Sequence, residues 1–334
     1  MFVAWLGCSG GPSDGETGPE TPSETGSAPD PRVAVGEPWV CADPGARDGG
    51  PFDRVVLGAD WPRTGDPVEG GRGVSIADLD GDGHLDLFVP QTGSASRFLF
   101  GDGAGGFADR SDQALAGGLR DAFGASTADV DGDGDADLFV YRVTSPPVIA
   151  RNGGDGTFTA EAHPEWDPTT PGCGGSGSWG DLDLDGDLDL FYGRLGKYRD
   201  ALAMLEPCRH TLALNDGAGG FVDASDRLPE DIMGIRVMAS GWYDVDDDPF
   251  PELYLVVDLP QVLDGNRLVD NDGGVFSTRS GTGLEVDLAG MGLGAGDLND
   301  DGVVDFVVPG IDQVAVLASS AAAGVWVDAA AAWG

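Results

Sequence analysis

The sequence predicts an all-β fold, a β-propeller built from four-stranded blades. Two observations predict it: an acidic loop recurs five times along the 334 residues, and the same succession of short apolar runs and tight turns follows each copy. Units repeated at a fixed period bury a continuous core only between neighbours. The 56 glycines have no three-residue period, so they indicate frequent tight turns rather than a fibrous chain.

The acidic loop is nine residues long and has oxygen-bearing side chains at positions 1, 3, 5 and 9. Its five copies occupy residues 78–86, 129–137, 181–189, 244–252 and 297–305. Their first residues are 51, 52, 63 and 53 residues apart, so each unit holds more than a loop. The fourth copy has Pro249 in place of the glycine at position 6 and ends in Glu252, so its turn must differ. The fifth copy has Asn299 at position 3, which keeps an oxygen but loses a charge.

Each unit is predicted to contain four strands, with the acidic loop joining the first to the second. Small residues precede the loop, as in 73–77, and a β-favouring run follows it, as in 87–89. An Asn-Gly or Asp-Gly turn and an aromatic residue such as Phe107 come later. Small residues suit the innermost strand, which crowds the axis of a propeller. Trp179 and Trp242 depart from this pattern, and either plug the channel or pack between blades.

These motifs resemble the FG-GAP or VCBS repeats of integrin α-subunit propellers and of bacterial surface proteins. The resemblance extends from about Phe52 to the C-terminus. It implies a propeller whose loops bind calcium on one face and whose other surfaces recognise proteins or carbohydrate. The domain is expected to span residues 36–334. Five blades are favoured. Six stay open because residues 52–56 match a fourth strand without the first three, and seven because many members of the family that the motifs resemble close with seven blades.

The loop chemistry predicts calcium, which takes six to eight oxygen ligands. Positions 1, 3 and 5 offer side chains, position 7 a main-chain carbonyl, and position 9 a closing carboxylate. An EF-hand loop begins in the same way but needs a glutamate at position 12, which no copy has. Up to five ions are expected. The predicted ligands are Asp78, Asp80, Asp82, His84 and Asp86; Asp129, Asp131, Asp133, Asp135 and Asp137; Asp181, Asp183, Asp185, Asp187 and Asp189; Asp244, Asp246, Asp248, Phe250 and Glu252; and Asp297, Asn299, Asp301, Val303 and Asp305.

The net charge of −40, from 58 acidic and 18 basic residues, excludes nucleic acid and anionic membranes as partners. Acidity alone would also suit solubility or a salty habitat. However, 23 of the 58 acidic residues lie in the five loops. This clustering favours cations as the partners of the loops.

The N-terminus predicts a surface or extracellular location. Residues 1–8 end in Leu-Gly-Cys and resemble the end of a truncated bacterial lipoprotein signal, in which Cys8 would be acylated. The charged start of such a signal is missing, so either the start codon is assigned too late or Cys8 is an ordinary thiol. Residues 9–35, rich in Gly, Ser, Thr, Pro and Glu, are predicted to be a disordered linker. Membrane contact is expected only through a lipid on Cys8, and Cys173 with Cys208 is the predicted disulfide, with free thiols as the alternative.

The chain is predicted to be a monomeric binding or adhesion module and not an enzyme. Its three histidines lie in no recognisable catalytic motif. The expected ligand is an extracellular protein or a carbohydrate, held by insertions at 142–151, 193–209 and 258–268. The second insertion is locally basic, with Lys197, Arg199 and Arg209. The alternative is an extracellular lectin or polysaccharide-acting enzyme on the same propeller.

Overall fold

The computed structural model describes residues 73–142, 145–166, 174–195, 209–246, 248–258, 265–311, 313–320 and 324–330. Over these residues the chain is all-β, as predicted. The predictions for residues 1–8 and 9–35, for Cys8 and for the pair Cys173 and Cys208 lie outside the described residues. None of the helices in the described ranges is long and apolar enough to cross a bilayer.

In the part of the chain that the structure describes, twenty strands form five four-stranded antiparallel sheets, and in each sheet the strands lie side by side in chain order. Sheet one contains β1 (Ser75–Ala77), β2 (Asp86–Val89), β3 (Arg97–Gly101) and β4 (Phe107–Asp109). Sheet two contains β5 (Ala122–Ala128), β6 (Asp137–Arg142), β7 (Val148–Asn152) and β8 (Phe158–Ala162). Sheet three contains β9 (Gly175–Gly180), β10 (Asp189–Arg194), β11 (Thr211–Asn215) and β12 (Phe221–Asp223).

Sheet four contains β13 (Val237–Tyr243), β14 (Glu252–Val257), β15 (Arg267–Asn271) and β16 (Phe276–Arg279). Sheet five contains β17 (Gly294–Gly296), β18 (Asp305–Pro309), β19 (Val314–Ser319) and β20 (Trp326–Asp328). Helical structure in the described ranges is limited to α1 (Ser111–Ala114) and the 3-10 turns η1 (Pro164–Trp166), η3 (Ser225–Arg227) and η4 (Glu230–Ile232). Every acidic loop therefore joins the first strand of a sheet to the second, as the sequence predicts.

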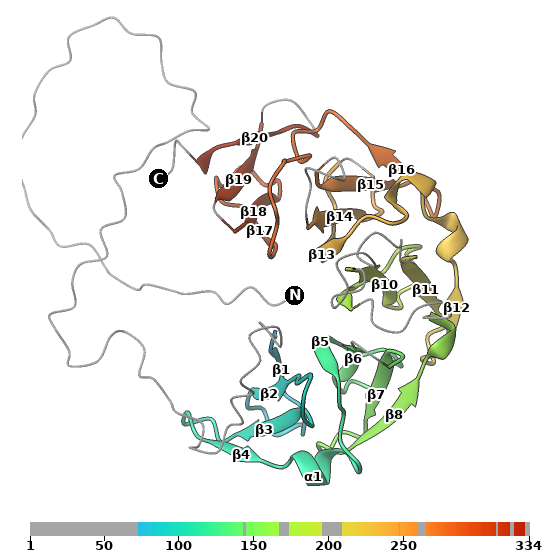
Figure 1. Cartoon of the computed structure of the whole chain (residues 1–334), viewed down its shortest axis with the longest axis vertical. Coiled ribbons are helices and arrows are strands. Elements are labelled where there is room, and N and C mark those ends of the chain that lie inside the picture. The colour runs from blue at the N-terminus through green and yellow to red at the C-terminus, as the bar shows by residue number, and fades with distance from the viewer. Residues whose placement is uncertain are drawn as a thin grey trace, which may run out of the picture.

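The five sheets follow one another around an arc, with their first strands on its inner side (Figure 1). Hydrogen bonds join these inner strands across sheets. Ser75 Oγ in β1 donates to the carbonyl of Ala125 in β5, at 2.9 Å. Ser240 Oγ in β13 lies 3.0 Å from the hydroxyls of both Ser176 and Ser178 in β9. The arrangement is that of propeller blades, in which small inner residues allow close approach.

Among the described residues the core consists of four apolar clusters, and each one lies between two consecutive sheets. The two tryptophans of the inner strands belong to this packing. Trp179 in β9 meets Phe139 of sheet two edge to face, at 6.2 Å between ring centres, and donates Nε1–H to Ser126 at 3.0 Å. Trp242 in β13 meets Phe191 of sheet three in the same way at 6.3 Å. Both rings therefore pack between sheets.

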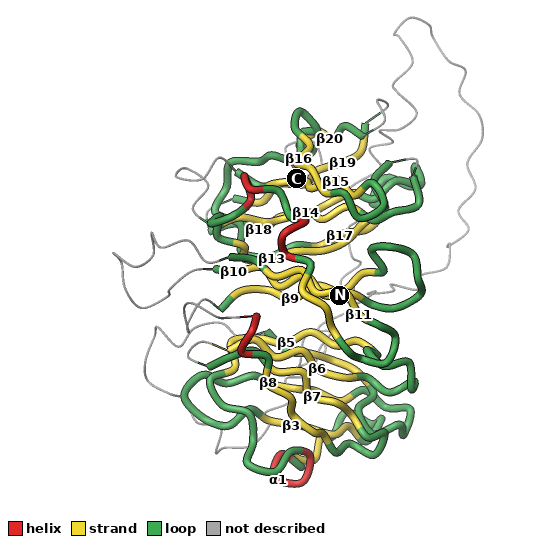
Figure 2. The backbone as a smooth tube through the Cα atoms, turned by 90° about the vertical axis from the view of Figure 1, so that its right-hand side faces the viewer, coloured by secondary structure: helices red, strands yellow, loops and turns green. Residues whose placement is uncertain are grey.

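Antiparallel order places the acidic loop and the turn between the third and fourth strands at the same end of each sheet. The turn between the second and third strands lies at the opposite end. In the side view, the strand-connecting loops accordingly gather along the two rims of the arc (Figure 2). One rim thus carries all five acidic loops next to one another.

Candidate metal centres

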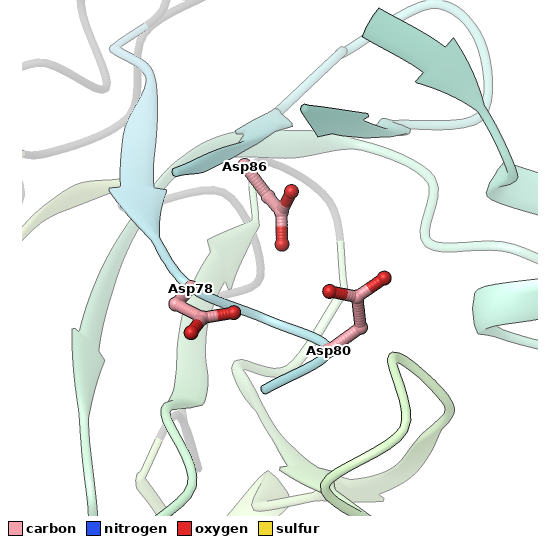
Figure 3. A group of neighbouring side chains, drawn as sticks. All are labelled: Asp78, Asp80 and Asp86. Carbon is pink, nitrogen blue, oxygen red and sulfur yellow. The ribbon is translucent and has the colours of Figure 1, made fainter. Parts of the chain in front are cut away.

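In the first four loops, the carboxylates of positions 1, 3 and 9 converge. One oxygen from each of the three side chains lies within 4.8 Å of the other two. The four groups are Asp78, Asp80 and Asp86; Asp129, Asp131 and Asp137; Asp181, Asp183 and Asp189; and Asp244, Asp246 and Glu252. In the first loop the three side chains face a common space (Figure 3).

The carboxylate at position 9 is the most deeply buried of the loop. The exposed fraction of this residue is 0–1% in all five loops. It begins the second strand and holds the loop closed. Asp86 Oδ2 accepts the N–H of Leu79 at position 2, at 2.7 Å, and its Oδ1 accepts the N–H of Gly101 in the third strand, also at 2.7 Å. Asp137, Asp189 and Asp305 make the corresponding pairs of bonds.

Burial raises the pKa of the position-9 carboxyls of the first four loops, Asp86, Asp137, Asp189 and Glu252, although the bonds from backbone N–H groups oppose the effect. The pKa of Asp137 and of Asp189 rises to about 6, and that of Glu252 to about 7. In each case neighbouring loop carboxylates raise the pKa further. A buried carboxylate of this kind is stabilised in its charged form by a nearby cation.

Five oxygens in these groups are shielded from solvent and accept no hydrogen bond from the described residues. They are Asp78 Oδ1, Asp80 Oδ1, Asp131 Oδ1, Asp181 Oδ1 and Glu252 Oε1. A buried acceptor without a partner is costly, and a carboxylate oxygen more so than a neutral one. A hard divalent cation takes as ligands converging carboxylate oxygens that accept no hydrogen bond from the protein. These oxygens therefore fit calcium.

The position-1 carboxylate also shapes the turn. Asp78 Oδ2 accepts the N–H of Gly83 at position 6, at 2.9 Å, and the same bond recurs in loops two, three and five at 2.8–3.1 Å. Gly83 has a φ of 85°, a left-handed conformation that favours glycine. In loop four Pro249 has no N–H to donate, yet Asp244 still joins its group.

The residues at positions 5 and 7 were both predicted as ligands. In the structure, the side chain of position 5 accepts a hydrogen bond from the main-chain N–H of position 7. Asp82 Oδ1 accepts the N–H of His84 at 2.8 Å. The same bond recurs in the other four loops at 2.8–3.0 Å. The position-5 residues do not belong to the groups of three. A ligand role for their second oxygen, and for the position-7 carbonyl, stays a prediction.

Loop five differs because Asn299 replaces a carboxylate at position 3. Its Nδ2 lies 3.1 Å from Asp301 Oδ2, which also accepts a hydrogen bond from Ser319 Oγ at 2.5 Å. Asp297 and Asp305 keep the bonds made by positions 1 and 9 in the other loops. The fifth loop thus has the same hydrogen-bonded frame, with one negative charge fewer at positions 1, 3, 5 and 9.

Arginines that the sequence analysis did not single out lie against position 3. Arg110 Nη1 donates to Asp80 Oδ2 at 2.8 Å, and Arg151 Nη1 lies 3.6 Å from Asp131 Oδ2. Arg279 pairs with Asp246 in loop four. The sequence has only 18 basic residues against 58 acidic ones, and this scarcity was the one signal that could have drawn attention to these arginines as partners of the loop carboxylates. Each arginine offsets part of the charge gathered in its loop.

Comparison with known proteins identifies one repeat directly. A family model described as an FG-GAP-like repeat matches residues 78–140, from the first acidic loop into the second strand of sheet two. No curated protein matches the chain. Among solved structures, the crystal structure of the V. cholerae biofilm matrix protein Bap1 is similar, with 15% identity and a TM-score of 0.41 over 73% of this chain. The chain spans 37% of the length of that protein. The chain therefore contains an FG-GAP-like repeat at residues 78–140, which confirms the resemblance that its sequence motifs carry.

Proposed function

We propose that this chain is a calcium-stabilised β-propeller that acts outside the cell as a binding or adhesion module. The observation that carries the proposal is the recurrence of three converging carboxylates with shielded, unpartnered oxygens in consecutive sheets. Positions 1, 3 and 9 would hold the ion, and position 5 and the position-7 carbonyl would complete its shell. Bound calcium supplies positive charge and coordination that tie the two ends of each loop together.

The proposal includes a ring of five blades formed within residues 36–334. Support comes from the five sheets, their chain-order succession around an arc and the inner position of their first strands (Figure 1). A ring of six or seven blades is the alternative. Counting the sheets in an electron-microscopy reconstruction would distinguish these rings.

An extracellular setting is part of the proposal. Calcium sites in extracellular modules bind with dissociation constants of about 10⁻⁴ to 10⁻³ M, a range that suits the calcium level outside cells. FG-GAP repeats are typical of surfaces that recognise proteins or carbohydrate, and the match at residues 78–140 supports this assignment. Binding to a glycan array and to extracellular proteins, each with and without EDTA, tests it. Turnover of a polysaccharide would contradict the non-enzymatic role.

Thermal unfolding with calcium and with excess EDTA tests the metal directly. An ion that binds only the folded chain stabilises it by about 2.7 kcal/mol at 100 times its Kd. We therefore expect a clear fall of Tm on chelation. The triple change Asp78→Ala, Asp129→Ala and Asp181→Ala should lower Tm in calcium and abolish most of the response to EDTA.

A matched control removes the same charge elsewhere. Asp112, Glu161 and Asp226 are exposed and lie outside the loops, so their joint replacement by alanine should leave the response to EDTA intact. Equal Tm values for the native chain in calcium and in EDTA would contradict the proposed metal sites.

A further inference from the structure

Three asparagines at the ends of third strands connect neighbouring acidic loops. Asn152, Asn215 and Asn271 have exposed fractions of 8%, 8% and 1%. Each side-chain Nδ2 has two hydrogens, and each donates in two directions. The bonds to the preceding loop end on the position-2 carbonyl: Leu79 O at 3.0 Å, Val130 O at 2.8 Å and Leu182 O at 3.0 Å. The bonds to the loop of the same sheet end on the position-8 carbonyl: Ala136 O at 3.1 Å, Leu188 O at 3.1 Å and Pro251 O at 3.3 Å.

Each amide is held from its other side as well. The Oδ1 atoms of the three asparagines accept the N–H groups of Gly154, Gly217 and Gly274 at 2.8–3.2 Å. The main-chain N–H of Asn215 donates to Asp189 Oδ1 at 2.8 Å, and that of Asn152 makes the same bond to Asp137 at 2.7 Å. Only one orientation of the side-chain amide therefore makes all of these hydrogen bonds, and in that orientation the amide connects two loops.

The position-2 residue is a sensitive point of each loop. In loop two, Val130 stands between Asp129 and Asp131, two predicted ligands, and its N–H bonds to Asp137, a third. A movement of Val130 therefore displaces all three carboxylates. Its carbonyl is the group that Asn215 holds. The asparagine thus connects the ligands of one group to those of the next.

We propose that these three asparagines couple calcium binding along sites one to four, so that an ion in one loop raises the affinity of the next. The proposal rests on the proposed function, because it concerns the same loops. Without calcium, converging carboxylates repel one another, and the first ion must order its loop. A shared amide that is already ordered lowers that cost for the neighbouring site, which is positive coupling through conformational entropy.

The chain also shows where the coupling stops. In sheet five the place of the asparagine is taken by Ser319, whose Oγ donates to Asp301 of its own loop. The shorter hydroxyl makes no bond to loop four within the described residues. Site five is therefore expected to bind independently of site four.

Calcium titration followed by NMR of the position-6 glycine amides of loops one to three tests the coupling at these sites separately. Gly186 N–H bonds to Asp181 and reports site three. Site two is disabled by Asp131→Ala with Asp133→Ala, which leaves site three's own residues unchanged. We expect this change to weaken calcium binding at Gly186 about five-fold or more, the usual size of coupling between sites. In the Asn215→Ser background, disabling site two should leave the affinity at Gly186 unchanged.

Two further measurements keep the outcomes separable. Asn215→Ser introduces the residue that sheet five already carries, so the fold is expected to tolerate it, and far-UV circular dichroism checks this. Asn271→Ala removes the equivalent residue one sheet further on and should leave the dependence of site three on site two intact. If disabling site two has no effect on Gly186 in the native background, the coupling is wrong. If Gly186 in the native chain never responds to calcium, the proposed function itself fails at this site.

Discussion

Leu184 occupies position 4 of the third loop with a φ of 61°. Loops one and two have Gly81 and Gly132 at this position, with φ values of 70° and 73°. The left-handed conformation costs an ordinary L-residue roughly 1–2 kcal/mol, whereas glycine adopts it freely. Because Leu184 is 46% exposed, its side chain contributes little burial in return. The third loop therefore carries a local strain that the first two lack.

Leu184→Gly should stabilise the protein. Relief of the strain is offset in part by the greater freedom of glycine in the unfolded chain, so a net gain of about 0.5–1 kcal/mol is expected. Chemical denaturation in calcium measures it. Leu184→Ala keeps the strain and should change the free energy of unfolding little, so a gain for alanine equal to that for glycine would contradict the argument.

His210 is a buried residue in which a neutral ring is required. Its Nδ1 accepts the N–H of Arg194 at 3.0 Å, so Nε2 carries the proton and donates to Ile232 O, also at 3.0 Å. Burial lowers the pKa of His210 to about 4 from its usual 6.5. Below pH 6.5 the unfolded chain binds a proton that the folded chain refuses.

Acid should therefore remove the contribution of His210. This contribution is present above pH 6.5 and is lost as the pH falls toward about 4, by up to roughly 3 kcal/mol. His210→Gln keeps one acceptor and one donor but does not titrate. Its unfolding free energy, followed between neutral and acid pH, should fall less steeply than that of the native chain. Parallel curves would show that His210 does not titrate in this range.

The acidic positions could be predicted from the sequence because their spacing is local. The roles of Asn152, Asn215 and Asn271 could not, because their bonds to the preceding loop join residues 73, 85 and 89 positions apart. The sequence indicated only that these asparagines begin tight turns. A single sequence does not show which carbonyl a buried amide reaches.

At the scale of the strand, the inner position makes different demands on glycines that look alike in the sequence. A Cβ on Gly177 in β9 would lie 2.5 Å from the ring of Phe139, which is completely buried. A Cβ on Gly296 in β17 would meet no atom within 4 Å. Close approach of neighbouring sheets therefore depends on the first glycine and not on the second.

Gly177→Ala should destabilise the fold, while Gly296→Ala should have little effect. Overpacking a filled core costs about 1–3 kcal/mol, because Phe139 cannot move into solvent. Urea denaturation of the two variants gives the comparison directly. Equal stabilities for the two would mean that the inner strands are separated more widely than the structure shows.

The order of strands within each sheet was predictable, since the acidic loop, the apolar run and the turn occur in a fixed succession. Strand length was not. β5 and β13 each have seven residues, whereas β1 and β17 have three. Sheets two and four have neighbours on both sides along the arc, and sheets one and five end the described array. The length of a first strand thus depends more on whether its sheet has neighbours on both sides than on the composition of the strand.

At the scale of the whole molecule, charge is the dominant feature. If the loops bind calcium as proposed, removing it would leave the formal net charge of −40 with only the neighbouring arginines to offset the loop carboxylates. Raising the ionic strength from about 0.1 M to about 1 M shortens the Debye length from about 10 Å to about 3 Å. We expect added NaCl to raise Tm strongly in EDTA and only slightly in calcium. The same Tm increase in both buffers would place the repulsion outside the loops.

The succession of sheets around the arc was predictable from the repeat, because each unit buries its apolar face only against the next. The contacts at the two ends of the arc were not predictable. Val74 and Ile76 on the inner side of sheet one are 50% and 41% exposed, and the loop pattern contains no signal for what would cover them. Internal repeats specify contacts between like units, whereas the two ends of an array need contacts of another kind.

The uneven repeat period has a consequence for how such a protein can diversify. Between β6 and β7 the chain has five residues, 143–147, but between β10 and β11 it has sixteen, 195–210. This connection leaves the end of the sheet opposite the acidic loop. Lineages can therefore lengthen, shorten or replace it by insertion without altering the spacing of the converging loop carboxylates. Selection for a new partner and selection for folding then act on separate rims of the same sheet, and a foreign peptide spliced in at this connection would be carried without disturbing the carboxylate groups.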